Sequence, residues 1–292
     1  MPELPDITVY VERLAAKVVA HRLVRVRVGN PFLLRTVVPS LVSAEGRAVC
    51  AVERFGKRVV IALEGELFLV IHLMIAGRLR WQAAGKTTAR NALASFEFDA
   101  GTLVLTEAGS RRRASLHVVQ GREALRALDA GGIDVLAASR DEFAARLVAE
   151  NHTLKRALTD PQLFSGIGNA YSDEILHRAR LSPVALTRSL DAAQVDRLHD
   201  ATGSVLRDWI ARLGREAGDW PEKVTAFHPQ MAVHGRFGQP CPDCGAPVQR
   251  IVYAENETNY CARCQTGGKL LADRALSRLL KASWPKNIDE LS

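Results

Sequence analysis

The chain has 292 residues, of which 47% are hydrophobic and 24% are charged. This composition excludes a disordered chain, and the length suits two domains of ordinary size. No apolar run is long enough to cross a bilayer, so we expect no membrane partner. The formal net charge of +7 favours nucleic acid as a partner, because cationic side chains neutralise phosphates. A basic enzyme without such a partner is the alternative.

The N-terminal region predicts one helix followed by strands. The helix predicted over 6–22 has apolar residues at helical spacing on one face: Ile7, Tyr10, Leu14 and Val18. Strand-like segments follow at 23–28, 48–52, 58–73 and 78–81, with a turn at 64–65. A further hairpin is predicted over 95–106, with its turn at 99–101. One helix followed by consecutive strands predicts a β-sandwich or barrel.

From about residue 121 the pattern changes to helix. Apolar residues at spacings of three and four predict helices over 122–130, 141–150, 154–160, 172–179 and 192–214. The domain boundary is predicted within 121–137, where adjacent glycines break the pattern. A loop-like segment, 214–240, leads to a cysteine-rich region, and a short helix is predicted over 270–280. The predicted fold class is therefore α+β.

Four of the five cysteines form two Cys-x2-Cys pairs separated by sixteen residues: Cys241, Cys244, Cys261 and Cys264. Two such pairs on a short β-hairpin, with strands at 248–253 and 258–260, supply the tetrahedral sulfur ligands that zinc prefers. Because all four ligands are cysteines, no position stays open for water, and we predict one structural Zn²⁺. The spacing leaves open whether this ribbon only stabilises the fold. Cys50 is expected to be a small buried residue.

Pro2 directly follows the initiator methionine. A small second residue favours removal of Met1, which would leave Pro2 with a free secondary amine. An α-amino group titrates near ~8, so a useful fraction is neutral and nucleophilic at cellular pH. Such an amine can attack a sugar C1′ and form a Schiff base, with Glu3 exchanging protons beside it. Many chains begin with Met-Pro, so this motif alone is weak.

The segment LFSGIGNAY at 163–171 predicts a phosphate-binding turn. Gly166 and Gly168 permit a tight turn whose backbone N–H groups face a phosphate. Asn169 adds a side-chain donor, and Lys155 adds a positive charge from the preceding helix. A capped turn between helices, with no ligand, is the alternative.

These motifs, in this order, resemble the formamidopyrimidine-DNA glycosylase / endonuclease VIII family, of which the chain would be a divergent member. The matching segments are PELPD at 2–6, Lys57 in RFGKRVV, LMIAGRL at 73–79 after His72, the helix–two-turns–helix module within 151–183, and the finger segments 234–245 and 259–265. The resemblance implies an N-terminal β-sandwich with flanking helices and a C-terminal helical domain that carries the zinc hairpin. The implied domains are 1–125 (catalytic), 136–230 (helix–two-turns–helix), 231–266 (zinc finger) and an extension at 267–292.

The resemblance implies a bifunctional DNA glycosylase and abasic-site (AP) lyase of base excision repair. Its partner would be double-stranded DNA with a damaged base or abasic site, bound by a monomer. Pro2 would displace the base and leave an imine on the opened sugar, and β- or β,δ-elimination would then cut the strand. Glu3 would protonate the ring oxygen, and Lys57 would hold the phosphate beside the lesion. Lys155, Gly168 and Asn169 would clamp phosphates around the flipped nucleotide.

The resemblance also implies a wedge that fills the gap left by the flipped nucleotide. Met74 and Ile75 lie in the loop where the family carries its methionine wedge; Ile75 matches the methionine and Met74 replaces a glycine. Arg111, Arg112 and Arg113 lie in the loop that supplies an arginine and a phenylalanine. A solvated basic patch is the alternative interpretation of these arginines.

The sequence departs from the family at several positions. Asp6 replaces the usual glutamate. Asn256 stands five residues before the third cysteine, where the family has an arginine. Asparagine donates a hydrogen bond but carries no charge, so we expect weaker binding of phosphate by the finger. Arg250 could compensate for this loss. The segment 216–229 lacks a close match to the region that grips oxidised purines, and the chain continues 27 residues beyond Gln265.

Two other functions stay open. One is a non-catalytic, damaged-DNA-binding protein on the same fold. The other is an RNA-binding or ribosome-associated protein with a similar zinc ribbon, which gives no reason for Pro2 and Glu3. The N-terminus carries acids where a secretory signal has basic and apolar residues, so we expect a cytoplasmic, nucleoid-associated protein.

Overall fold

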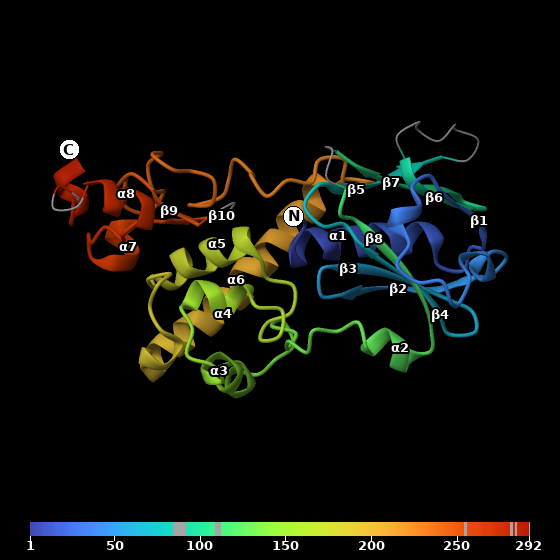
Figure 1. The fold of residues 1–292 in the computed structure, drawn as a ribbon, viewed down its shortest axis with the longest axis horizontal. Helices are drawn as coiled ribbons and strands as arrows, with labels where there is room; N and C mark the ends of the chain where they lie inside the picture. Colours follow the sequence, from blue (N-terminus) through green and yellow to red (C-terminus); the bar gives the residue numbers. More distant parts are fainter. Residues whose placement is uncertain (84–91, 109–111, 254–255, 281–282, 284, 292) are drawn as a thin grey trace. The chain divides into compact units, whose positions relative to one another are not determined.

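The computed structural model describes residues 1–83, 92–108, 112–253, 256–280, 283 and 285–291, without the side chains of 253, 256 and 274–276. The chain forms two compact units (Figure 1). The first contains Met1–Ala130 and Trp209–Thr225, and the second contains Gly131–Asp208 and Ala226–Ser292. The predicted α+β fold, with N-terminal β-sheets followed by helices and a zinc-finger hairpin, is confirmed.

The first unit is a sandwich of two four-stranded antiparallel sheets, ordered β2-β3-β4-β8 and β1-β6-β7-β5. Their strands are β1 Leu23–Val28, β2 Val49–Phe55, β3 Arg58–Leu63, β4 Leu67–His72, β5 Gly77–Gln82, β6 Ala92–Phe98, β7 Gly101–Glu107 and β8 Ser115–Gln120. The predicted strands and both hairpins are confirmed. The prediction missed β8, although Ser115 and His117 alternate with apolar residues as in a strand. It pairs with β4 along its whole length.

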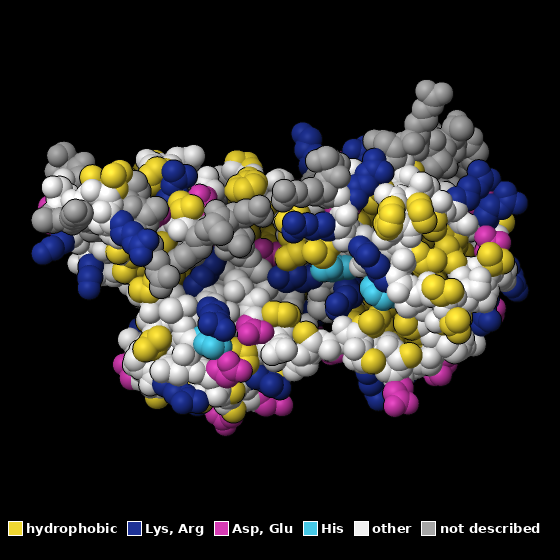
Figure 2. Space-filling view, viewed as in Figure 1, with side chains coloured by type: hydrophobic (Ala, Val, Ile, Leu, Met, Phe, Trp, Pro, Cys, Tyr) yellow, Lys and Arg dark blue, Asp and Glu magenta, His cyan; other side chains and the backbone are white. Residues whose placement is uncertain are grey.

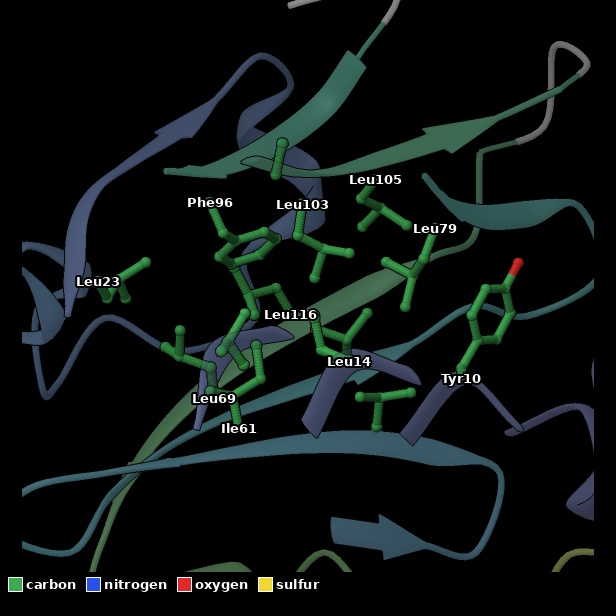
Figure 3. Packing of buried hydrophobic residues seen from close by; sticks show 14 of the residues in the cluster. Tyr10, Leu14, Leu23, Ile61, Leu69, Leu79, Phe96, Leu103, Leu105 and Leu116 are labelled. Carbon is green, nitrogen blue, oxygen red and sulfur yellow. The ribbon is translucent and has the colours of Figure 1, made fainter. Parts of the chain in front are cut away.

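Alternate residues of the strands fill the space between the two sheets (Figure 3). On β3, Val59, Ile61 and Leu63 join this core. Val60 and Ala62 point to the opposite face, where they join a second buried cluster. Successive side chains of a strand point to opposite faces of the sheet, so a continuous apolar run such as β3 suits a strand that is covered on both faces.

Helix α1 (Leu4–Val18) was predicted over 6–22. It begins two residues earlier than the predicted start and ends four residues earlier than the predicted end. The earlier start follows from a capping box, in which the Asp6 carboxylate accepts the Glu3 N–H at 2.9 Å. The helix stops early because Val19 is extended and Ala20 takes a φ of 67°, in the left-handed region. The predicted apolar face is confirmed, since each of its residues is at most 1% exposed: Ile7, Tyr10, Leu14 and Val18.

Residues 209–225 belong to the first unit although they follow the helical region in sequence. Trp220 attaches them, with its ring centroid 5.7 Å from that of Tyr10 and 6.2 Å from that of Trp81. Its indole Nε1–H donates to the Leu79 carbonyl at 3.1 Å, and the residue is 6% exposed. This single side chain therefore joins α1, β5 and the returning segment.

The helices confirm the predicted order. They are α2 Arg122–Arg126 in the first unit, then α3 Arg140–Val148, α4 Leu154–Thr159, α5 Asn169–Ala179 and α6 Ala192–Glu216, whose last residues return to the first unit. Short 3-10 turns lie at Pro31–Leu33, Leu41–Ala44, Thr187–Ser189 and Ile288–Leu291. None of the described helices combines the length and apolar character needed to span a membrane.

The finger hairpin consists of β9 (Gln249–Tyr253) and β10 (Asn256–Tyr260), as predicted, followed by the unpredicted helix α7 (Ala262–Thr266). Helix α8 (Arg274–Leu280) begins later than predicted, because the Leu270 N–H donates to the Lys286 carbonyl at 2.9 Å outside any helix. The C-terminal extension covers the hairpin. Leu270 and Ile288 pack on Ile251 and Tyr260, and the Asp273 carboxylate accepts the Val252 N–H at 3.0 Å.

The expectation that Cys50 is buried is wrong. Cys50 lies on β2, at the edge of its sheet, where the register shifts between Val49 and Ala51. Its side chain is exposed.

Trp220→Ala is expected to lower the free energy of unfolding of the first unit by about 3–5 kcal/mol, because it empties a buried aromatic site. Trp220→Phe keeps most of the ring and loses the hydrogen bond to Leu79, so a cost of about 1–2 kcal/mol is expected. Urea unfolding followed by circular dichroism measures both. If Trp220→Ala unfolds like wild type, the returning segment does not contribute to the fold of this unit.

Candidate functional sites

Pro2 and Glu3 precede the first turn of α1, and both are buried. Burial lowers the pKa of the Met1 amine; Glu3 opposes this change, and the cations Arg78 and Lys57 lower the pKa further. An amine at this end of the chain is therefore held in surroundings that favour its neutral, nucleophilic form. This is the environment that a nucleophilic N-terminal amine requires.

Asp6 is a titratable group that the sequence analysis treated as a mild substitution. Burial raises the pKa of Asp6 to about 7. The hydrogen bond from the Glu3 N–H opposes this rise, and the negative charge of the Glu3 carboxylate adds to it. Its carboxyl group therefore changes protonation state near neutral pH and can donate as well as accept a hydrogen bond. Burial arises from tertiary packing, so no local sequence signal identifies this property.

A pocket of about 370 Å³ opens beside Asp6 within the first unit. Asp6 and Val9 of α1 form one side, and residues 213, 216, 217 and 220–224 form the other. Glu222 and Lys223 bring charges of both signs to its lining. The segment that showed no close match to the family's purine-gripping region thus supplies part of a pocket wall.

Lys57 lies in the two-residue turn between β2 and β3, and β3 begins at Arg58. Arg58 pairs with His72 of β4 across the ladder. Burial, together with the positive charges of Arg58 and Lys57, lowers the pKa of His72 to about 4, so His72 is neutral at physiological pH. Figure 2 shows histidine side chains among Lys and Arg side chains on the visible face of this unit. The surroundings of Lys57 suit an anionic ligand.

Met74 and Ile75 lie in the tight loop between β4 and β5, closed by the Gly77 N–H to the Leu73 carbonyl at 2.9 Å. Met74 takes a φ of 52°, in the left-handed region, which agrees with its standing in place of a glycine. A Cβ on Gly77 would collide with the Leu73 carbonyl oxygen. Ile75 is 57% exposed, so it is the apolar side chain that projects from this loop.

Arg112 and Arg113 are exposed, and Arg111 lies outside the described residues. The Glu107 carboxylate accepts the N–H groups of Arg113 and Ala114, at 2.9 and 3.2 Å. Glu107 therefore fixes the backbone after the arginine run while the guanidinium groups stay at the surface.

Lys155, Gly168 and Asn169 come together at the start of α5, where Gly168 is the N-cap. The Lys155 ammonium group donates to the Asn169 carbonyl at 2.6 Å and pairs with Asp173 at 2.5 Å, and it is 13% exposed. The Asn169 side-chain amide donates to the Glu257 carbonyl of β10 at 2.9 Å. Asn169 thus attaches α5 to the finger hairpin, and Lys155 attaches α4 to α5.

Helix α5 carries two buried acids that sequence reasoning missed. Asp173 is 0% exposed, and besides pairing with Lys155 it contacts His234 at 2.8 Å and accepts the Asn259 N–H at 3.1 Å. Glu174 accepts three consecutive backbone N–H groups, of residues 232–234, at 2.7–2.9 Å. The one available signal was an acidic pair on a helix that packs against its neighbours. Both carboxylates bind the finger, or the segment that leads to it, to α5.

The four predicted zinc ligands converge, with every sulfur within 4.8 Å of the others. The distance is 3.4 Å between the sulfurs of Cys244 and Cys261 and 3.9 Å between those of Cys241 and Cys264. Zn–S bonds of about 2.3 Å in tetrahedral geometry place sulfurs about 3.8 Å apart, so this donor set fits one structural zinc ion.

Asn256, the position of the missing arginine, begins β10, and its side chain lies outside the described part of the chain. Arg250 pairs with Glu257 at 3.5 Å and lies 4.3 Å from the ring centroid of Phe237. Its charge is therefore engaged within the finger.

Comparison with known proteins identifies the family. Family models match the formamidopyrimidine-DNA glycosylase N-terminal domain at residues 1–116, its H2TH domain at 134–217, and the zinc finger found in FPG and IleRS at 238–267. The formamidopyrimidine-DNA glycosylase of Thermus thermophilus is 34% identical over 279 residues, which cover 92% of this chain and 100% of that protein. The chain belongs to the formamidopyrimidine-DNA glycosylase family.

Solved structures agree with this assignment. The crystal structure of MutM (FPG) from Thermus thermophilus has a TM-score of 0.77 at 33% identity, over 90% of this chain and 98% of that one. Lactococcus lactis Fpg, solved in complex with DNA that contains an abasic site, has a TM-score of 0.81 over 90% of this chain and 99% of that one. At 22% identity the second likeness concerns the fold alone.

Asp6→Asn is expected to remove a pH-dependent part of the stability. The carboxyl pKa is 3.8 in the reference state and about 7 in the folded protein, so between these values only the folded state holds the proton. Wild-type stability should therefore fall as pH rises through this window, by at most about 1.4 kcal/mol per pH unit, and level off above it. The variant keeps an oxygen that can accept the Glu3 N–H. Urea unfolding between about pH 4 and pH 8 compares the two proteins, and parallel curves would contradict the burial of a titrating Asp6.

Cys261→Ser is expected to abolish stoichiometric zinc binding and to expose the backbone amides of β9 and β10 to hydrogen exchange, because folding of such a finger depends on its metal. Elemental analysis and exchange mass spectrometry measure the two effects. Cys50→Ser, which removes an exposed thiol outside the cluster, is the matched control and should keep its zinc. Full zinc retention in Cys261→Ser would disprove the four-sulfur site.

Proposed function

We propose that this protein is a DNA glycosylase of base excision repair that also has abasic-site lyase activity. Family membership over most of the chain supports the glycosylase assignment, since the curated relatives are named formamidopyrimidine-DNA glycosylase. The observation that carries the lyase assignment is the burial of the chain's N-terminal end, which lowers the pKa of the Met1 amine; Arg78 and Lys57 lower it further, and Glu3 opposes the change. A neutral amine is the form that attacks carbon.

Pro2 is the proposed nucleophile once Met1 has been removed. Its nitrogen forms a bond to the sugar C1′ and gives up its proton, while the bond from C1′ to the base breaks and the base leaves with the electron pair and a proton. Glu3 protonates the ring oxygen, so the sugar opens and an iminium ion joins it to Pro2. Loss of a C2′ proton then expels the 3′ phosphate by β-elimination, and water releases the enzyme. Only groups already present at the start of α1 are needed for the first step.

The pocket beside Asp6 is the proposed receptor for the flipped base. Asp6, which lines the pocket, follows Glu3 by three residues, and Trp220 gives the pocket an apolar surface. Asp6 can donate or accept a hydrogen bond near neutral pH, because its pKa is about 7. Glu222 and Lys223 add one acceptor and one donor. This lining differs from a purely apolar pocket and suits a base with polar edges.

The remaining predicted residues are proposed to bind duplex DNA. Lys57 would hold a phosphate beside the lesion, and Ile75, next to Met74, would enter the base stack. Arg111, Arg112 and Arg113 would attract the backbone, and Lys155, Gly168 and Asn169 would bind phosphates at the start of α5. Asn256 would make an uncharged contact from the finger. In this proposal residues 1–125 perform catalysis, while 136–230 and 231–266 bind DNA as parts of a monomer.

Borohydride trapping on duplex DNA with an abasic site tests the proposal. Wild type lacking Met1 is expected to become covalently joined to the DNA, and Pro2→Gly or a retained Met1 should abolish the adduct. Glu3→Gln should slow base release by about 10²- to 10⁴-fold while DNA binding is kept. Cys50→Ser is the control and should trap like wild type.

The outcomes separate the alternatives. A wild-type protein with a free Pro2 that binds abasic DNA but does not trap would be a non-catalytic damage-binding protein. Preference for RNA over duplex DNA in a competition assay would favour an RNA-binding protein instead.

A further inference from the structure

A histidine from the helical module reaches the zinc site. His177 lies on α5 and is 4% exposed. Its Nε2 atom is 3.3 Å from the Cys241 sulfur and 3.9 Å from an Asp243 carboxylate oxygen. His177, Asp243 and Cys264 also form a second group whose ligand atoms lie within 4.8 Å of one another. The surroundings of the zinc site therefore include a side chain from outside the finger.

The charge of the site explains why a donor is needed there. Zn²⁺ with four thiolates carries a net charge of −2, and buried thiolates are stabilised by N–H donors. The Cys261 sulfur accepts the Cys264 N–H at 3.5 Å, and the Cys244 sulfur accepts the Ala246 N–H. These donors belong to the finger's own backbone.

Cys241 differs from these two ligands. Among the described residues, the nitrogen within hydrogen-bond distance of its sulfur is Nε2 of the His177 side chain. Cys241 is also buried at 2% exposure, which limits the help that water can give. A side chain of α5 is therefore placed where it could donate to this ligand.

We propose that His177 is a positioning residue of the zinc centre, which donates its Nε2–H to the Cys241 thiolate and so slows zinc loss. Outer-shell donors of this kind orient metal ligands and strengthen metal binding. The role is indirect, because the four sulfurs complete the zinc coordination and His177 acts through one of them.

The position of His177 on α5 gives this contact a second consequence. His177 follows Asp173 by four residues and Glu174 by three, so it lies on the same side of the helix as each of these acids. Asp173 binds β10, Glu174 binds the segment before the finger, and His177 binds the metal site itself. The zinc centre is thereby attached to the helix that begins at Asn169.

Zinc release to an excess of a chromogenic chelator tests the proposal. His177→Phe removes the donor while keeping an aromatic ring, and it should release zinc about 10- to 100-fold faster than wild type. His177→Gln keeps an N–H donor and should restore most of the retention. His199→Phe is the matched control, because His199 packs against Phe143 in the same unit and should leave the release rate unchanged.

Cobalt substitution provides a readout that packing alone does not move. Wild type should show the absorption of four-sulfur coordination, and His177→Phe should shift the sulfur-to-cobalt charge-transfer band with the same coordination. A wild-type spectrum typical of three sulfurs and one nitrogen would make His177 a ligand and overturn the proposal. Wild-type release rates in His177→Phe, or equally fast release in His177→Gln, would overturn it as well. These measurements need no DNA, so their failure is separate from any failure of the trapping experiment.

Discussion

Exclusion of water from the beginning of the chain is the constraint on which the proposed chemistry depends. Helix α1 packs its apolar face into the β-sandwich, and this packing carries Pro2, Glu3 and Asp6 into a buried position. Burial acts in opposite directions on the groups there, since it lowers the pKa of the amine and raises that of Asp6 to about 7. The same packing thus favours the neutral forms of the Met1 amine and of the Asp6 carboxyl group.

Helix α5 has the corresponding role in the second unit. An isolated buried carboxylate is costly, but Asp173 and Glu174 are each satisfied by several donors. The donors come from α4, from the segment before the finger and from β10, so the acids specify how these elements meet. Lys155 and Asn169 consequently have a structural role in addition to the phosphate contacts proposed for them.

The finger has an uncharged residue at position 256, and the C-terminal extension packs on its hairpin. Asn256 stands where the resemblance to the family implies an arginine, and Arg250 is engaged with Glu257 and Phe237. The C-terminal extension packs Leu270 and Ile288 on the back of the hairpin. A hairpin of two strands is marginally stable alone, so zinc and this extension both support it.

The sequence by itself determined the elements whose signals are local. Apolar spacing located α1 and the strands, the cysteine spacing located the zinc site, and ordered motifs located the family. It misplaced Cys50, missed β8 and did not reveal the titration of Asp6 or the network around Asp173. Only the tertiary structure decided the exposure of Cys50, the pKa of Asp6 and the ion pairs of Asp173, because these properties depend on residues distant in the chain. His177 shows the same limit, since its partner Cys241 lies 64 positions away.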